Sequence, residues 1–156
     1  MGIVGINMRN ARYLLPSNPR RLYGLVDDKL QTKRLAEDRE IAVPETYGVI
    51  RNPSDINRIA RILANHPSFV IKPCRGSGGK GVLVISGQED GYFLKPSGAR
   101  LTLDDIKHYL SNILAGLFSL GGRRDYALIE YRVTPARLLT DISFQGAPDI
   151  RVVMLA

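Results

Sequence analysis

The pattern of apolar and polar positions predicts several short strands, two of which enclose the most distinctive segment of the chain. Residues 69–71 and 82–85 are apolar and rich in β-branched side chains, as is typical of strands. Between them lie residues 73–81, of which four are glycine. We therefore predict a β-hairpin with a glycine-rich loop, called the glycine loop below. Further strands are expected at residues 47–50, 91–94, 126–131, 138–144 and 150–155.

Three longer segments have the composition or spacing of helices. Residues 26–39 contain good helix formers, and Asp27 and Asp28 near the start of this segment suit the helix dipole. Ser54 is expected to cap a second helix, and Thr102 a third that stops at Gly121-Gly122. The apolar positions of the second and third helices are spaced to form buried stripes: Ile56, Ile59, Ala60 and Leu63, then Ile106, Tyr109, Leu110, Ile113 and Leu117.

Composition limits the classes of function. The 156 residues carry a net charge of +7, which fits anionic partners such as nucleotides, acidic amino acids or nucleic acid. A single cysteine excludes an internal disulfide and a multi-cysteine zinc site, and is typical of a cytoplasmic protein. His66 and His108 have no further histidine or cysteine at ligand spacing, so no metal-ligating residue is assigned. No apolar run approaches the roughly 18 residues of a membrane span, so no membrane partner is expected.

The glycine loop has the chemistry of an anion site. Glycines let the backbone fold over an anion and direct N–H groups at it, while Arg75 and Lys80 add positive charge. Lys72, at the end of the preceding strand, would project a second charge toward the same anion, so a polyphosphate is the expected ligand. The segment is not a P-loop, because Gly81 follows Lys80 and a strand rather than a helix comes next. The alternative is a flexible hairpin loop without a ligand.

Two other features of this region have less specific interpretations. Lys29 and Lys33 lie four residues apart on one helix face, a spacing typical of a solvated surface. Cys74 lies next to Arg75, which can lower the pKa of a thiol. No base is evident beside Cys74, so it is not assigned as a nucleophile.

The order of the motifs resembles that of the ATP-grasp ligases. Asp28-Lys29 and the segment Ile-Ala-Val-Pro-Glu-Thr at 41–46 are followed by Val-Ile-Lys-Pro at 70–73 with the glycine loop. Leu-Ile-Glu-Tyr at 128–131 and Asp-Ile-Arg-Val at 149–152 complete the set. Together with residues 10–13 and 18–23, the similarity covers the whole chain and is closest to the branch of ribosomal-protein glutamate ligases, the alpha-L-glutamate ligase-like proteins.

The resemblance implies an α+β fold in which a nucleotide lies between two antiparallel sheets and the glycine loop closes over its phosphates as a flap. Residues 1–50 would form a helical arm and linker, residues 51–131 the small lobe with the flap, and residues 132–156 the start of a second, antiparallel-sheet lobe.

The resemblance also implies roles for individual residues. Lys29 and Lys72 would reach the phosphates, Glu130 and Tyr131 would form the hinge whose backbone meets the adenine edge, and Arg151 would be catalytic by steadying an acyl-phosphate. The flap would consist of Ser77, Gly78, Gly79 and Lys80, and Asp149 would bind the nucleotide. If the resemblance is set aside, Lys29 would be a surface lysine and Glu130 a charged residue at the end of a strand. Asp149 and Arg151 would be exposed residues on one face of a strand.

The implied activity is an ATP-dependent carboxylate–amine ligase, with glutamate as the natural guess for one substrate and an amine or peptide as acceptor. The family holds magnesium through an Asp, a Glu and an Asn that follow the Asp-Ile-Arg strand, so these ligands are expected beyond residue 156. The 156-residue chain is therefore expected to bind but not to catalyse, and its apolar strand at 150–155 to favour self-association. The alternative is a non-catalytic nucleotide- or nucleic-acid-binding module. Nucleic acid is disfavoured because no aromatic-rich strand pair is present.

Overall fold

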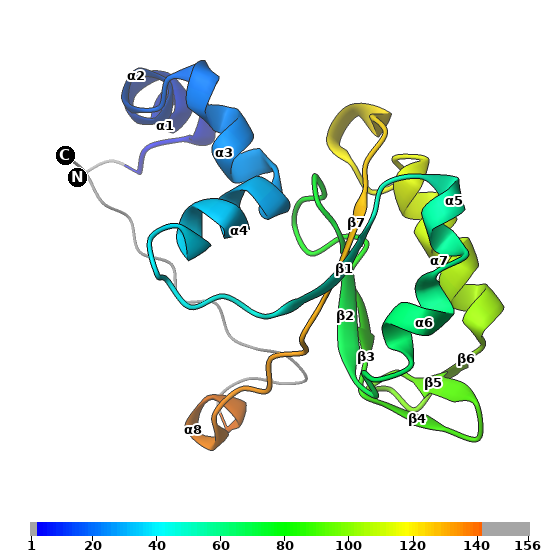
Figure 1. Cartoon of the computed structure of the whole chain (residues 1–156). Helices are drawn as coiled ribbons and strands as arrows, with labels where there is room; N and C mark the ends of the chain where they lie inside the picture. Colours follow the sequence, from blue (N-terminus) through cyan, green and yellow to red (C-terminus); the bar gives the residue numbers. More distant parts are fainter. Residues whose placement is uncertain (1–2, 142–156) are drawn as a thin grey trace.

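A four-stranded antiparallel sheet forms the centre of the molecule. The computed structural model describes residues 3–141, and Figure 1 shows their arrangement. The strands lie in the order β1 (Thr46–Ile50), β7 (Ala127–Glu130), β2 (Phe69–Pro73) and β3 (Leu83–Ile85). A smaller antiparallel sheet follows, of β4 (Gly87–Glu89), β5 (Tyr92–Leu94) and β6 (Arg100–Leu101). The α+β class with antiparallel sheets and the predicted β2–β3 hairpin are thereby confirmed.

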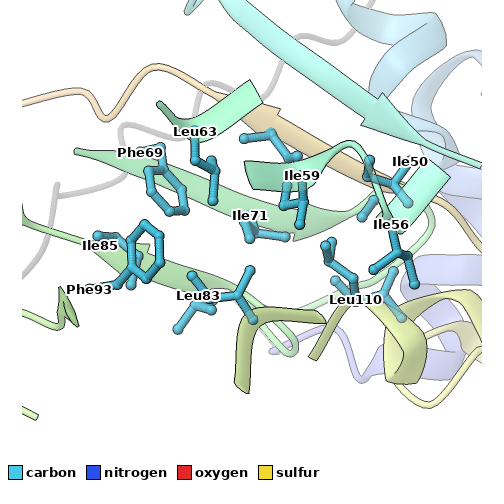
Figure 2. Close-up of a cluster of buried hydrophobic side chains, with 14 residues drawn as sticks. Ile50, Ile56, Ile59, Leu63, Phe69, Ile71, Leu83, Ile85, Phe93 and Leu110 are labelled. Carbon is cyan, nitrogen blue, oxygen red and sulfur yellow. The ribbon is translucent and has the colours of Figure 1, made fainter. Parts of the chain in front are cut away.

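One face of the central sheet packs against three helices, α5 (Pro53–Ile56), α6 (Ile59–Leu63) and α7 (Leu103–Leu114). Strand side chains alternate between faces, so Phe69 and Ile71 of β2 and Ile129 of β7 all point into this core. Figure 2 shows how the side chains of strands and helices interdigitate there. The fully buried positions include Ile50, Ile59, Leu63, Phe69, Ile71, Ile85, Ile106, Leu110, Ile113 and Ile129.

The opposite face of the sheet is covered in part by α4 (Lys29–Glu37), the last helix of the N-terminal segment. This segment contains α1 (Ile6–Arg9), a π-helical turn at Asn10–Leu14, α2 (Leu15–Ser17), a 3-10 turn at Arg20–Leu22, α3 (Tyr23–Asp27) and α4. A second, small apolar cluster joins Leu30 of α4 to Cys74 and Leu128. No helix among the described residues is long and apolar enough to cross a membrane.

Three predicted helices differ from the structure at their boundaries. The helix at 26–39 is broken at Asp28, whose extended backbone (ψ 105°) ends α3 and whose carboxylate caps α4 by accepting from Leu30 and Gln31 N–H. The second helix is capped by Asn52 rather than Ser54, because Asn52 and Asp55 form a capping box, and it is interrupted between α5 and α6.

The third helix begins as predicted but ends early. Thr102 caps α7 and forms a capping box with Asp105. The helix stops at Leu114, and Gly116 with φ +85° turns the chain two residues later, so Leu117 leaves the predicted stripe and is 67% exposed.

The predictions for the end of the chain have mixed outcomes. Within the expected strand 138–144, the structure shows α8 (Arg137–Thr140) instead, and its later residues lie outside the described part of the chain. The strand expected at 150–155, and the self-association expected from it, also lie outside the described residues. The division of the chain at residues 50 and 131 stays a prediction.

Candidate functional site

Strand alternation directs three neighbouring side chains away from the main core. On β2 the core residues Ile71 and Pro73 flank Lys72, and on β7 Leu128 and Glu130 alternate with Ile129. Lys72 lies opposite Leu128 in the antiparallel register, which makes Lys72 and Glu130 diagonal neighbours on the face that α4 covers. The sheet therefore presents a cation and an anion toward α4.

Glu130 is the centre of a buried cluster of charges. One carboxylate oxygen forms an ion pair with Lys72, and the other lies 3.2 Å from Lys33 Nζ. Lys33 also donates a hydrogen bond to the carbonyl of Pro44. Glu130 and Lys33 are only 5% and 6% exposed, whereas the side chain of Lys72 is 25% exposed. Lys72 is thus the member of the cluster that solvent or a ligand can reach.

Lys29 extends this cluster toward the glycine loop. Its backbone N–H donates to the carbonyl of Cys74 at 2.9 Å, and its ammonium donates to the carbonyl of Gly76. Burial lowers the pKa of Lys29, and the neighbouring charge of Lys72 lowers it further, although Cys74 and nearby carboxylates oppose this. The contact ties the start of α4 to the base of the loop.

The lysines line a pocket of about 280 Å³, called the lysine pocket below. Its charged residues are Lys29, Lys33, Lys72 and Glu130. The rest of its wall is mainly apolar: Val26, Thr32, Ala36, Val43, Pro44 and Leu128. A pocket with an apolar wall and cations at one place suits an amphipathic ligand with a flat apolar part and an anionic part.

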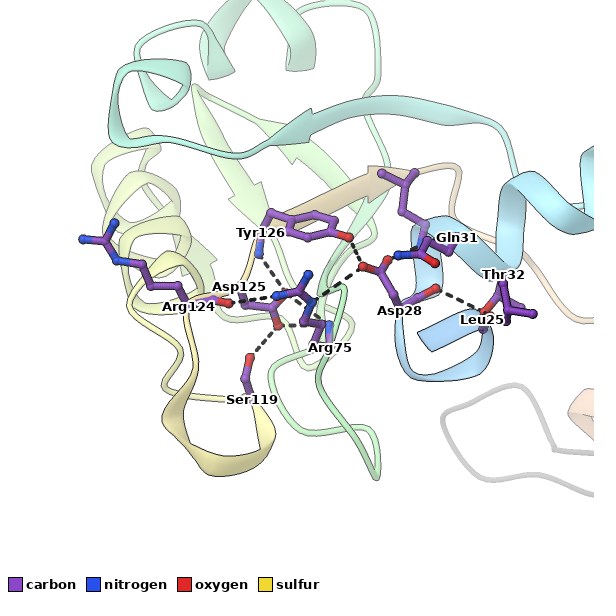
Figure 3. Close-up of polar contacts among 10 residues, drawn as sticks. Leu25, Asp28, Gln31, Thr32, Arg75, Ser119, Arg124, Asp125 and Tyr126 are labelled. Carbon is purple, nitrogen blue, oxygen red and sulfur yellow. Dashed lines mark hydrogen bonds and ion pairs between the residues drawn. The ribbon is translucent and has the colours of Figure 1, made fainter. Parts of the chain in front are cut away.

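A second polar network holds the loop base against α4 (Figure 3). The Tyr126 hydroxyl donates to buried Asp28, and Arg75 Nε lies 3.6 Å from the same carboxylate. Buried Asp125 accepts from the backbone N–H groups of Arg75 and Tyr126 and, at 2.5 Å, from the hydroxyl of Ser119. Because each buried carboxylate has several donors, both are compensated within the protein.

The tip of the glycine loop differs from its base. Ser77, Gly78, Gly79 and Lys80 are exposed, and both glycines have positive φ (61° and 71°) with nothing within 4 Å of an added Cβ. Gly81, also at positive φ, lies against Phe118. The four residues assigned to the flap are therefore exposed to solvent, whereas the base of the loop is packed against the rest of the protein.

The environment of Cys74 contradicts the effect expected from its basic neighbour. The thiol is fully buried, and burial together with the charges of Asp28 and Asp125 raises its pKa to about 12. Lys29 and Arg51 act in the opposite direction but more weakly. Cys74 is therefore a packing residue of the α4 interface.

The structure brings together part of the predicted site. Lys29, Lys72 and Glu130 converge in the lysine pocket, and the flap residues lie on the loop whose base Lys29 contacts. Tyr131 does not line this pocket: its side chain is 47% exposed and its N–H donates to the Glu45 carbonyl. Asp149 and Arg151 lie outside the described residues.

Several site residues were missed or misassigned from the sequence. Lys33 is buried rather than a solvated surface lysine. The sequence does show that Lys33 shares a helix face with Lys29. It does not show that Lys33 pairs with Glu130, which is 97 residues away. Asp28 and Tyr126, 98 residues apart, could not be paired from local patterns either.

Residues 3–141 contain no group of three His, Cys, Asp or Glu side chains placed to hold a metal ion. His66 instead stacks on Tyr47, with ring centroids 3.5 Å apart.

Comparison with known proteins yields one finding. The model of a family described as sugar-transfer associated ATP-grasp matches residues 8–156. Neither the search of curated proteins nor that of solved structures gave a match. The match supports the ATP-grasp superfamily predicted from the motif order, and it does not extend to the glutamate ligase-like branch.

Proposed function

Because the chain belongs to the sugar-transfer associated ATP-grasp family, we propose that the lysine pocket binds ATP for an ATP-dependent ligase reaction. The observation that carries this proposal is the convergence of Lys29 and Lys72 beside an apolar wall and below the glycine loop. The apolar wall formed by Val26, Val43 and Leu128 suits the adenine ring. The two ammonium groups suit the phosphates.

Glu130 and Lys33 prepare Lys72 for this role. An ammonium group has three donor hydrogens, so Lys72 can keep Glu130 and still donate to a phosphate oxygen. Lys33 directs its donors at Glu130 and Pro44 and is buried, so it holds the carboxylate in place rather than reaching the ligand. Lys72 is thereby oriented before ATP arrives, which reduces the entropy lost on binding.

The reaction class we propose has two steps. A substrate carboxylate attacks the γ-phosphorus of ATP, and ADP leaves with the electrons of the broken P–O bond. An amine then attacks the carbonyl of the acyl-phosphate, loses a proton, and phosphate leaves as an amide forms. Lys29 and Lys72 would stabilise the charge that develops on the phosphate oxygens during the first step. Glutamate as the carboxylate substrate rests on the resemblance to the glutamate ligase-like proteins alone.

ATP-grasp proteins generally bind ATP together with Mg²⁺, but the described residues 3–141 supply no cluster of ligands that fits the ion. Asp149 and Arg151 keep their proposed roles in nucleotide binding and acyl-phosphate stabilisation, outside the described residues.

Protection of lysines from chemical acetylation tests the proposal on the 156-residue chain. ATP should slow acetylation of Lys29 and Lys72, measured by mass spectrometry, because their amines would face phosphate oxygens. Lys107, on α7 and paired with Asp104, is the control and should react at the same rate with and without ATP. ATP binding that leaves Lys29 and Lys72 as reactive as Lys107 would show that the nucleotide lies elsewhere.

A further inference from the structure

A larger pocket lies on the other side of Lys29. It has a volume of about 510 Å³ and is called the arginine pocket below. Its wall comes from the α3–α4 junction, the base of the glycine loop, and the turn that follows α7: Gly24, Val26, Asp27, Asp28, Lys29, Gln31, Arg75, Gly76, Ser77, Ser119 and Arg123. Val26 and Lys29 line both pockets, so the two are adjacent.

The charges of the arginine pocket favour an anion. Lys29, Arg75 and Arg123 are its cations, and Asp27 and Asp28 are its acidic residues. Asp28 is only 3% exposed and already accepts from two backbone N–H groups and the Tyr126 hydroxyl. Asp28 is also paired with Arg75, so Lys29 and Arg123 remain to outnumber the one other acidic residue, Asp27.

Arg75 is held in position before any ligand binds. Its Nε lies 3.6 Å from Asp28 Oδ2, and one terminal nitrogen donates to the Arg124 carbonyl at 3.5 Å. The guanidinium also stacks over the Tyr126 ring at 5.3 Å from its centroid. Figure 3 shows this arrangement between Asp28 and Tyr126. A guanidinium fixed in this way retains other N–H donors for an oxyanion.

The side chain of Arg123 has no partner among the described residues that line the pocket. Arg123 follows the glycine pair that ends the turn after α7, its side chain is exposed, and it has no ion pair or hydrogen bond with the described part of the chain. The hydroxyl-bearing residue Ser77 lies on the same wall, next to the loop tip. Two arginines and a serine around one cavity match the groups that recognise carboxylate and phosphoryl oxygens.

We propose that the arginine pocket binds an oxyanion group of the substrate that reacts with ATP, with Arg75 and Arg123 as its contacts. The inference rests on the proposed function, since a nucleotide in the lysine pocket would place its terminal phosphate at the shared Lys29, next to this second pocket. The oxyanion has two sources, a substrate carboxylate or a phosphoryl group. Their shared chemistry is a set of terminal oxygens that accept charge-assisted hydrogen bonds from guanidinium groups.

Nuclear magnetic resonance of the arginine Nε–Hε groups in the full 156-residue chain tests this inference with two probes. L-glutamate tests the carboxylate source, and inorganic phosphate the phosphoryl source. At least one probe should shift the signals of Arg75 and Arg123 saturably. Arg123→Ala should weaken that binding about tenfold, as loss of one charged hydrogen bond does.

Arg124→Ala is the matched control. Arg124 is adjacent in sequence and equally charged, but it lines a different pocket with Arg51 and Asn52. This variant should bind the probe as the wild-type chain does. Equal weakening by Arg123→Ala and Arg124→Ala would mean that general surface charge attracts the anion, and would overturn the proposal.

ATP titration of the same proteins separates this inference from the proposed function. The Arg123→Ala chain should bind ATP within about twofold of wild type, because the nucleotide is assigned to the other pocket. Intact ATP binding without arginine shifts by either probe would overturn the arginine pocket alone. Failure of the wild-type chain to bind ATP would overturn the ATP assignment, whereas saturable arginine shifts would still support an oxyanion site.

Discussion

At the scale of single residues, Lys33, Glu130 and Lys72 place three charges together on the face of the sheet that α4 covers. Removing a buried pair of charges from water is costly, and this cost is offset only when the geometry and the remaining hydrogen bonds are good. Here Glu130 has two lysine partners, and Lys33 gains the Pro44 carbonyl as well. Apolar side chains of similar size would often stabilise the fold as well as these charges do, so the cluster is consistent with a role in orienting Lys72.

Neutralising the centre of this cluster should destabilise the fold. In Glu130→Gln the shape is kept, but buried Lys33 loses its counter-charge, so the free energy of unfolding should fall by about 3 kcal/mol. Lys107→Ala, which removes an exposed pair with Asp104, should change it by less than about 1 kcal/mol. Urea denaturation of both variants measures the difference. Equal stability of the two would mean that the buried charges are not coupled.

Tyr126 should give the protein a pH dependence at alkaline pH. The Tyr126 pKa is raised from 10.0 to about 12. Burial is the largest cause, and the hydrogen bond to Asp28 and the negative charge of Asp28 add to it. The folded state thus holds the phenol proton more tightly than the unfolded state does. Its contribution to stability is complete below pH 10 and is lost as the pH rises toward 12.

The ultraviolet absorbance of ionised tyrosine measures this pKa. One tyrosine of the wild-type chain should titrate near pH 12, and that component should be missing from Tyr126→Phe. The variant should also lose less stability than wild type between pH 10 and pH 12. A titration curve that the substitution leaves unchanged in this range would contradict the Tyr126–Asp28 contact.

At the scale of elements, the glycine loop combines a fixed base with an open tip. Its base is held by Asp125, which accepts the Arg75 N–H, and by the packing of Gly81 on Phe118. Its tip, Ser77 to Lys80, is exposed, and Gly78 and Gly79 lie in open space. Because four of residues 73–81 are glycine, the sequence alone leads to an expectation of mobility over residues 75–81 without a ligand. The contacts of the base lead us to expect it for the tip only.

Amide hydrogen exchange should show this division. The N–H of Arg75, bonded to a buried carboxylate, should exchange slowly, whereas those of Gly78 and Gly79 should exchange at nearly the rate of an unfolded peptide. Slow exchange along the tip in the absence of ligand would identify the loop as a rigid structural turn.

Two glycine substitutions distinguish the base from the tip by stability. Gly78 and Gly81 both have positive φ (61° and 73°), so alanine costs about 1–2 kcal/mol at either position. At Gly81 the new Cβ would also lie 2.7 Å from Phe118 Cβ, a clash that is absent at Gly78. Gly81→Ala should therefore be the more destabilising by at least about 1 kcal/mol in urea denaturation. Equal costs would mean that the loop base is not packed as described.

At the scale of the whole molecule, one sheet serves two purposes through its two faces. The face under α5, α6 and α7 forms the main core, and the face under α4 forms part of the lysine pocket. Figure 1 shows α4 and these three helices on opposite sides of the sheet. A substitution such as Ile71→Ala therefore acts on stability, whereas one at the adjacent Lys72 acts on the site. The alternation of a strand separates the two by a single residue.

The sequence predicted the local parts of this arrangement better than the distant ones. The hairpin, the glycine loop and the position of Lys72 follow from short-range patterns, and the order of motifs led to the ATP-grasp family that the family match supports. Asp28 breaks the first predicted helix as the N-cap of α4, which is a local role, but its contacts with Tyr126 and Arg75 come from distant parts of the chain and could not be predicted from local patterns. The burial of Lys33 depends on Glu130 in the same way.

Isothermal titration of ATP into the 156-residue chain and three lysine variants tests the central claim most directly. Lys72→Ala should weaken binding about tenfold to a hundredfold, as loss of a charge-assisted contact does. Lys29→Ala should weaken it less, because Lys72 is fixed by a strand and by Glu130, whereas Lys29 extends from the start of a helix. Lys107→Ala, an exposed control on α7, should bind like wild type. Unchanged affinity in Lys72→Ala would contradict the assignment of the lysine pocket to the phosphates of ATP.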